Sequence, residues 1–222
     1  PREKADLTGY SHKLEQRMMC VDIAQLDPLQ IYVTLTQTVI PRPITWVLSE
    51  NANGIFNLAP YSFFNTVSSE PPLVMISTGL RSDGRPKDTR ENVKQRQDFL
   101  IHIASVAQLE DLNASSATLS AGESEVAHLG LTTFPLAGSR LPRLKDARVV
   151  FVRTLHKEPQ HRGQHHLDDP GARQGIYLDD EVVGRDPKGR RQIHADRIHP
   201  VGRLGAGEYV DFGRIIKLKR PA

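Results

Sequence analysis

The chain has 222 residues, with 29 Lys and Arg against 26 Asp and Glu and a formal net charge of +3. This length suits one domain with a full-sized core, and 38% hydrophobic and 25% charged residues are typical of a soluble globular protein. The small positive excess is not the clustered basic surface of a nucleic-acid binder, and no apolar run is long enough to cross a membrane, so neither partner is expected. The single cysteine, Cys20, excludes an internal disulfide and favours a reducing, cytoplasmic location.

The N-terminal part of the chain is polar and mixed in charge. We expect residues 1–30 to form an arm that packs on the domain or on a partner subunit, and residues 31–222 to form the domain. Residues 31–37 alternate apolar and polar positions, which predicts a half-buried strand at the start of that domain.

The rest of the chain shows short strand patterns with few helical ones. Strands are predicted at residues 44–48, after the turn at 51–54, and at 73–77, 99–103 and 148–155. Helices are predicted at residues 88–96 and 106–113, and residues 117–143 are rich in loops. Short helices among many strands favour a closed antiparallel barrel over a parallel βαβ sheet.

Residues 156–175 are rich in histidine and charge. His165 and His166 lie close to two carboxylates, Asp168 and Asp169, which raises the alternative of a metal site. Adjacent residues of a strand point to opposite faces, so two neighbouring histidines rarely bind one ion. We expect a solvated loop here and no metal site.

The segment before residue 96 carries a helix start. Asp88 followed by Glu91 fits a capping box led by Asp, so the first free N–H groups of the helix would point toward Arg85 and Lys87. With the Thr89 hydroxyl, these groups would form a phosphate seat. The alternative is a capped surface helix with solvated basic residues.

An apolar and aromatic segment from Asn57 to Asn65 also carries polar side chains. Pro60 is incompatible with a regular central strand. The segment either bends so that its backbone groups face a ligand, or forms an ordinary kinked barrel strand.

Four sequence blocks stand in one order along the chain. They read P-R-P-I-T-W-V from Pro41, N-L-A-P-Y-S-F-F-N from Asn57, S-S-E-P-P-L-V from Ser68 and G-R-P-K-D-T from Gly84. In this the chain resembles the flavin reductase-like family, which includes flavoredoxins and the reductase components of two-component monooxygenases. The resemblance implies a mainly β fold with short helices, the FMN-binding split β-barrel of antiparallel Greek-key type.

The resemblance also implies a cofactor and a reaction. The cofactor would be FMN, with FAD as the alternative, and NAD(P)H would be the co-substrate that transfers hydride to the flavin. The protein would then be a flavin reductase, which could supply a partner monooxygenase; the alternative is an FMN-binding electron carrier that does not itself use NAD(P)H. A homodimer with flavin near its interface is expected. The flavin-binding residues implied are Arg42, Thr45, Asn57, Ala59, Pro60, Tyr61, Ser62, Phe63, Ser77, Arg85, Lys87, Asp88 and Thr89.

Two later features complete the expectations. Glu125 to Thr132 resembles a family phrase on a loop close to the flavin face, so His128 is the candidate catalytic residue, stacking on nicotinamide or donating a hydrogen bond to its carboxamide. The alternative is an ordinary surface histidine. In the glycine-rich tail, Tyr209 and Phe212 are expected in the core.

Overall fold

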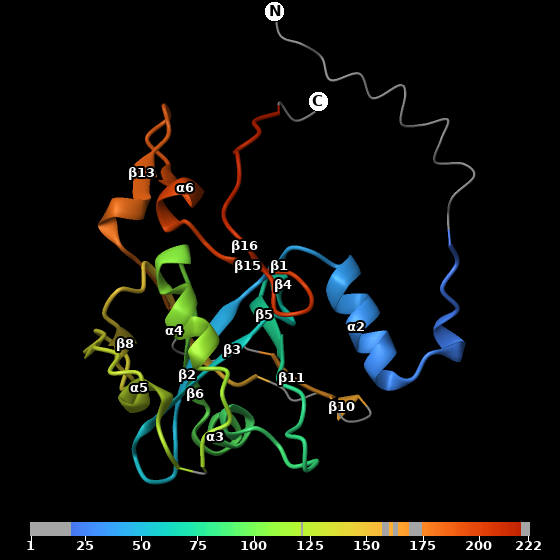
Figure 1. Ribbon diagram of the computed structural model, residues 1–222. Helices are drawn as coiled ribbons and strands as arrows, with labels where there is room; N and C mark the ends of the chain where they lie inside the picture. The colour runs from blue at the N-terminus through green and yellow to red at the C-terminus, as the bar shows by residue number, and fades with distance from the viewer. Residues whose placement is uncertain (1–18, 121, 157–159, 162–163, 169–174, 219–222) are drawn as a thin grey trace, which may run out of the picture.

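The computed structural model describes residues 19–120, 122–156, 160–161, 164–168 and 175–218. Among these residues the chain is mainly β, and every strand pairing is antiparallel (Figure 1). The strands form a five-stranded sheet, a four-stranded sheet and smaller sheets. This confirms the expected fold class, although the sheets do not close into one continuous barrel.

The five-stranded sheet is the centre of the fold, in the order β12-β9-β6-β2-β3. Its strands are β2 (Thr45–Glu50), β3 (Phe56–Tyr61), β6 (Asp98–Ile103), β9 (Val149–Thr154) and β12 (Gly175–Leu178). Alternate residues of a strand face opposite sides of a sheet, and here both sides are covered. Trp46 and Leu48 belong to one apolar cluster, while Val47 belongs to the other.

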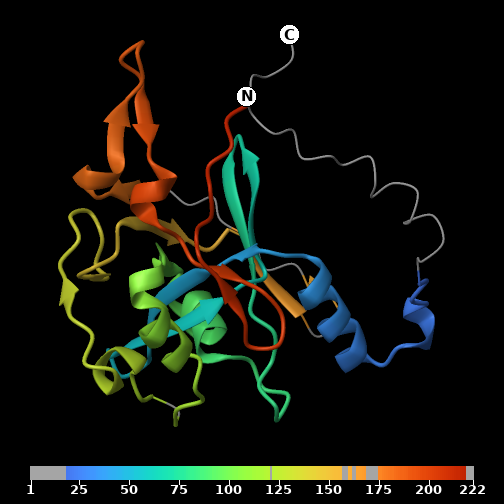
Figure 2. The same ribbon diagram turned by 45° about the horizontal axis from the view of Figure 1, so that its top comes forward.

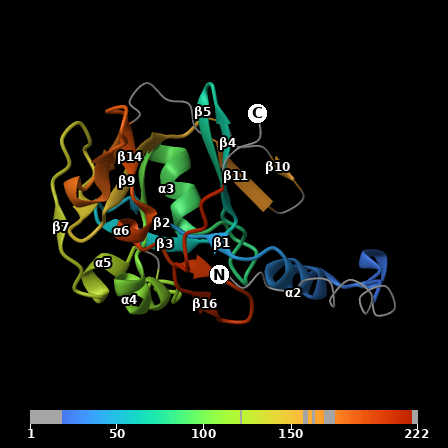
Figure 3. The same ribbon diagram turned by 90° about the horizontal axis from the view of Figure 1, so that it is seen from above.

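Short helices cover the first face of this sheet, and α3 (Asp88–Arg96) lies against the second. The first face is covered by α4 (Leu109–Ala114) and α5 (Glu125–His128), with the small pair β7 (Thr133–Phe134) and β8 (Arg143–Leu144) close by. On the second face, Val93 of α3 packs with residues of β2, β6 and β5 (Pro72–Ser77). Figure 3 shows α3 between the five-stranded sheet and the strand pair β4–β5.

The four-stranded sheet has the order β10-β11-β5-β4 and is built on a hairpin. Its remaining strands are β4 (Phe64–Ser69), β10 (Gln160–His161) and β11 (Gln164–Asp168). In Figure 2 the β4–β5 hairpin, in teal, projects from the body of the protein.

The expectation of a loop over residues 156–175 is therefore wrong for its described strands. β11 pairs with β5, which places His166 opposite Ser77 and Asp168 opposite Met75. The open edge of β5 offers unpaired backbone groups that a neighbouring segment can satisfy, whatever its side chains. Asp169 and residues 170–174 lie outside the described part of the chain.

The C-terminal part adds two small sheets and completes the list of elements. β1 (Arg42–Pro43) pairs with β15 (Gly202–Arg203), which pairs with β16 (Tyr209–Val210). A separate hairpin and the remaining short helices are β13 (Val183–Arg185), β14 (Arg191–Ile193), α6 (Ala195–Ile198), η1 (Ile23–Gln25), η2 (Val106–Gln108) and η3 (Asp180–Val182).

The strand predicted over residues 31–37 is wrong, because this segment is part of helix α2 (Pro28–Thr38). Asp27 accepts a hydrogen bond from the Gln30 N–H, and the Gln30 side chain accepts one from the Asp27 N–H, which completes a capping box. Pro28 at the first helical position supplies a backbone angle suited to a helix. The cap outweighs the strand preference of the β-branched residues, and the expected domain boundary at residue 30 falls inside this helix.

Other predicted elements agree with the structure. The helix predicted at 88–96 is α3 with the same ends, and the strands predicted at 44–48, 73–77, 99–103 and 148–155 correspond to β2, β5, β6 and β9. Pro60 is accommodated because β3 is the outer strand of its sheet, where a missing backbone donor is tolerated. In the described part of the chain the longest helix has 11 residues, and none is long and apolar enough to cross a bilayer.

His102 is a buried polar residue in the middle of the five-stranded sheet. Its Nδ1 lies 3.1 Å from the Trp46 carbonyl oxygen, and its Nε2 accepts a hydrogen bond of 3.2 Å from the Leu144 N–H. These roles define a neutral ring that donates through Nδ1. Burial lowers the pKa of His102 from 6.5 to about 4.

We therefore expect stability to fall in acid through His102. Between pH about 6.5 and about 4 the unfolded chain binds a proton at this residue and the folded protein does not, so the free energy of unfolding falls as pH falls. Across this pH range, protonation of His102 in the unfolded chain lowers the free energy of unfolding by about 3 kcal/mol. Urea unfolding of His102→Gln across this range would show a shallower decline than the wild type, whereas the exposed His128→Gln would follow the wild type. Equal slopes for His102→Gln and wild type would contradict the assignment.

Candidate functional site

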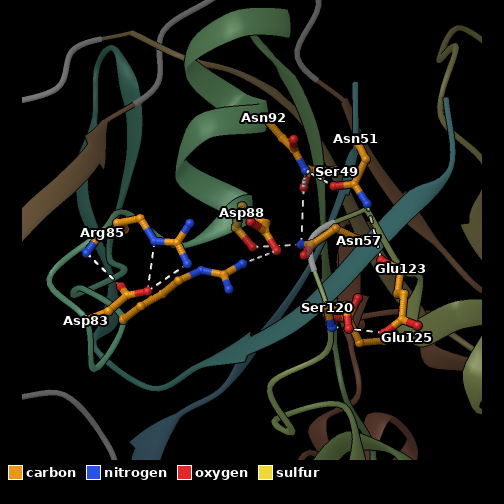
Figure 4. A network of polar contacts seen from close by, with 12 residues as sticks. Ser49, Asn51, Asn57, Asp83, Arg85, Asp88, Asn92, Ser120, Glu123 and Glu125 are labelled. Carbon is orange, nitrogen blue, oxygen red and sulfur yellow. Dashed lines mark hydrogen bonds and ion pairs between the residues drawn. The ribbon is translucent and has the colours of Figure 1, made fainter. Parts of the chain in front are cut away.

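A buried network of polar side chains joins α3 to the five-stranded sheet (Figure 4). Asn57 of β3 donates to the Thr89 hydroxyl at 2.8 Å and to the Ser49 hydroxyl at 3.3 Å. Asn92, one turn further along α3, donates to Ser49 at 3.2 Å and to the Asn51 side-chain oxygen at 2.7 Å. The network fixes the first turns of α3 against β2 and β3.

The start of α3 differs from the expected capping box. Lys87 occupies the N-cap without a capping side-chain bond, and Asp88 is the first helical residue. The Asp88 carboxylate forms an ion pair with Arg81. The carboxylate is therefore directed to Arg81 and does not cap the helix, so the capping role predicted for Asp88 is wrong.

Lys87 lies beside the Tyr61 ring, with its Nζ 5.7 Å from the ring centroid. Surrounding protein atoms lower the pKa of the Lys87 ammonium, and the Arg81 charge lowers it further, although the residue as a whole is exposed. Among the described residues no carboxylate forms an ion pair with Lys87. The cation is available to an anion at the start of the helix.

Two cavities meet at Lys87, Pro60 and Tyr61. The first, which we call the lysine cavity, has a volume of about 250 Å³ and runs from Lys87 toward Glu125. The second, the hairpin cavity, has about 300 Å³ and lies between β5, the end of β3 and Tyr32 of α2. The two cavities also share Leu80, so they adjoin one another and together form one site.

Ten of the thirteen expected flavin-binding residues line this site. The lysine cavity is lined by Asn57, Ala59, Pro60, Tyr61, Lys87, Asp88 and Thr89. The hairpin cavity repeats Pro60, Tyr61 and Lys87 and adds Ser62, Phe63 and Ser77.

The other three lie outside the two cavities. Arg42 is buried and donates to the Thr36 and Leu204 carbonyl oxygens, so it holds α2 to the C-terminal segment. Thr45 is fully buried inside β2. Arg85 is exposed and pairs with Asp83 at 2.7 Å. The arginine that does line the lysine cavity is Arg81.

His128 lies elsewhere. It is exposed at the end of α5 and lines a wide groove of about 870 Å³ with Phe56 and Leu131. It lines neither cavity at Lys87. The expected role of His128 on the nicotinamide side therefore stays a prediction, and His128 does not line either cavity.

Glu125 is a site residue that sequence reasoning missed. Its Oε2 accepts a hydrogen bond of 2.8 Å from the Leu58 N–H, across 67 residues of chain, and it lines the lysine cavity. Burial raises the pKa of the Glu125 carboxyl, which the Leu58 hydrogen bond opposes. No local spacing connects the two residues, because the contact exists only once α5 docks on the outer strand β3.

Two buried hydroxyls in the site lack hydrogen-bond partners among the described residues. They belong to Tyr61, which lines both cavities, and Thr78, which lines the hairpin cavity. Burial raises the pKa of the Tyr61 phenol; the nearby Thr89 hydroxyl opposes this without reaching normal hydrogen-bond geometry. Buried hydroxyls are normally paired, so both point to a polar ligand.

A further cleft of about 540 Å³ lies between α4 and α6, away from Lys87, and carries charges of both signs, including Arg148 and Asp196. In the described residues no group of three or more His, Cys, Asp or Glu side chains could hold a metal ion. The side chains of His165 and His166 lie outside the description.

Comparison with known proteins identifies the family. Residues 37–167 match the family model described as the flavin reductase like domain. The chain is 34% identical to the uncharacterized protein YwrF of Bacillus subtilis over 202 residues, which cover 89% of this chain and 97% of that protein. The chain belongs to the flavin reductase-like family.

Solved structures agree with this assignment. Nitrilotriacetate monooxygenase component B from Bacillus cereus superposes with a TM-score of 0.81 at 28% identity, covering 91% of this chain and 99% of that one. A Shewanella frigidimarina protein described as a flavin reductase with a split barrel domain gives a TM-score of 0.76 at 20% identity, covering 92% and 100%. The fold is thus the split barrel expected from the sequence, and the class of protein is a flavin-related oxidoreductase.

Proposed function

We propose that the protein is an FMN-dependent oxidoreductase that takes hydride from NAD(P)H. The observation that carries this proposal is Lys87, an ammonium with no acidic partner among the described residues, at the start of α3 where two cavities meet. A helix N-terminus and a cation together favour a phosphate group. The family supports flavin as the bearer of that phosphate.

The residues of the site fit FMN in three respects. Lys87 and the first free N–H groups of α3 would hold the phosphate. The unpaired hydroxyls of Tyr61 and Thr78 would bond the polar edge or side chain of the flavin. Burial disfavours a negative charge on Tyr61 and Glu125, and the Asp88 carboxylate is paired with Arg81, so repulsion of an anionic ligand by the cavity wall is reduced.

The protein's part in the reaction is binding and positioning. FMN, when bound, supplies the hydride chemistry. The hydrogen bond from Asn57 to Thr89 fixes the position of α3 relative to β3. It therefore also fixes the distance between the proposed phosphate site and the floor of the cavity. Pro60 and Tyr61 supply that floor and exclude water from one side. The proposal includes FAD as an alternative flavin and a monooxygenase as an electron acceptor, as the likeness to a monooxygenase component B suggests.

Anaerobic reduction tests this function. The FMN-loaded protein should lose its yellow flavin absorbance when NADH or NADPH is added without oxygen. Dithionite serves as the control that the bound flavin can be reduced. If dithionite bleaches the flavin and neither nicotinamide does, the reductase proposal fails and the electron-carrier alternative is favoured.

The phosphate seat makes a separate prediction. Lys87→Ala should raise the Kd for FMN about 10- to 100-fold, because a hydrogen bond to a charged group is worth about 1.5–3 kcal/mol. Riboflavin lacks the phosphate and should bind both proteins alike. Lys94→Ala, at the exposed far end of the same helix, is the matched control. An equal loss for FMN and riboflavin would show that Lys87 does not hold the phosphate.

We also propose that the protein is a homodimer with the flavin near the subunit interface. Helix α2 buries only Thr36, while Leu29, Tyr32, Val33 and Leu35 remain exposed. Figures 1 and 3 show α2 to one side of the sheets. Tyr32 also lines the hairpin cavity, so a second copy seated on this face would border the flavin site.

Light scattering of the FMN-loaded protein should give twice the chain mass. Val33→Glu should convert it to a monomer, since the substitution places a charge in the buried interface. Ile193→Glu, on the exposed β14, should leave the dimer intact. A wild-type monomer that binds FMN tightly would refute the dimer and leave the flavin proposal standing.

A further inference from the structure

A third hollow adjoins the flavin site, and we call it the arginine chamber. It has a volume of about 220 Å³ and shares Pro60 and Tyr61 with both cavities. Its lining includes the apolar side chains of Ile44 and Leu112, together with Arg203 of β15. Among the residues that the structure describes, no Asp or Glu lines it.

Arg203 is held in place and yet has unused bonding capacity. Its guanidinium carbon lies 4.3 Å from the centroid of the Tyr209 ring, and the Tyr209 hydroxyl donates to the Asn113 side-chain oxygen at 2.9 Å. Stacking fixes the plane of the guanidinium, and the Asn113 bond fixes the ring beneath it. The Arg203 Nη1 atom is buried and has no hydrogen-bond partner among the described residues.

The charge beside this atom is also uncompensated. Arg42 lies directly opposite Arg203 in the β1–β15 pair. Arg42 bonds carbonyl oxygens and the Ser62 hydroxyl, which are neutral groups. Within the described residues neither arginine forms an ion pair with a carboxylate. Two adjacent guanidinium groups with neutral partners create a positive potential at the chamber.

The size of the chamber limits what can fill it. A cavity of about 150 Å³ admits benzene, so a chamber of about 220 Å³ suits one substituted six-membered ring and is too small for a dinucleotide. An arginine nitrogen without a partner favours an anionic oxygen, and a carboxylate on one ring is small enough for this volume. Ile44 and Leu112 would contact the ring, while Arg203 would bind the acid group.

We propose that the arginine chamber binds a single-ring organic acid next to the flavin, with Arg203 selecting its carboxylate. This inference rests on the proposed function for the flavin, because the chamber adjoins that site through Pro60 and Tyr61. Arg203 is then a specificity-determining residue for the molecule that meets the flavin.

The test uses the FMN-loaded protein and calorimetric titration with benzoate, its neutral analogue benzamide, and ADP-ribose. The wild type should bind benzoate at least about 10-fold more tightly than benzamide, the scale of a charged hydrogen bond. Arg203→Gln should remove that preference and leave benzamide binding and the Kd for FMN unchanged. Arg143→Gln is the matched control, because Arg143 also stacks on an aromatic ring, Phe134, at 5.7 Å and lies outside the chamber.

Each outcome decides between the two proposals. Equal affinity of the wild type for benzoate and benzamide overturns the inference. This comparison does not need the Arg203→Gln variant, so it remains decisive if that variant folds poorly. Loss of ADP-ribose binding in Arg203→Gln, with benzoate unaffected, overturns it in favour of a nucleotide phosphate. Failure of the wild type to bind FMN would instead count against the flavin proposal, and the two failures are therefore distinguishable.

Discussion

The position of helix α3 depends on hydrogen bonds more than on apolar packing. Its buried residues are Thr89, Arg90, Asn92 and Val93, so only one apolar side chain anchors nine residues of helix. The bonds from Asn57 and Asn92 to Thr89, Ser49 and Asn51 supply the missing attachment, and a satisfied buried network is directional in a way that apolar contact is not. Since Lys87 immediately precedes this helix, the same bonds set where the candidate phosphate site lies relative to the cavity floor.

The sequence predicted the elements whose signals are local. Helix α3 and strands β2, β5, β6 and β9 were found because their patterns lie within a few residues. Helix α2 differs from the strand predicted over residues 31–37 because apolar and polar positions alternate there as in a strand, whereas the upstream Asp27–Gln30 capping box favours a helix. Strand β11 was missed because its pairing with β5 depends on an edge that exists only in the folded chain.

The same distinction between local signals and tertiary contacts applies to the residues of the candidate site. Residues close together in the chain were placed together by the family resemblance and do line the lysine cavity: Asn57, Ala59, Pro60 and Tyr61, and Lys87 to Thr89. Arg81 and Glu125 were not found, because their partners are set by tertiary contacts. Arg85 was expected to bind the flavin, yet the turn directs Arg85 to Asp83 in solvent and Arg81 to the cavity. Which of two neighbouring arginines faces a ligand is a property of the turn, and composition does not encode it.

Arg42 helps to hold the structure around the arginine chamber, which adjoins the candidate flavin site. A buried guanidinium is costly unless its donors are satisfied, and Arg42 satisfies them with the carbonyl groups of Thr36, Val39 and Leu204. Those bonds join α2 to the C-terminal strands, and the close approach at Gly205, where an added Cβ would lie 2.3 Å from Gln37, requires the smallest residue there. The Arg42 bond to Leu204 attaches the backbone next to Arg203 to helix α2. A segment attached in this way needs little reordering to bind an anion, so the structural role of Arg42 supports the recognition role proposed for Arg203.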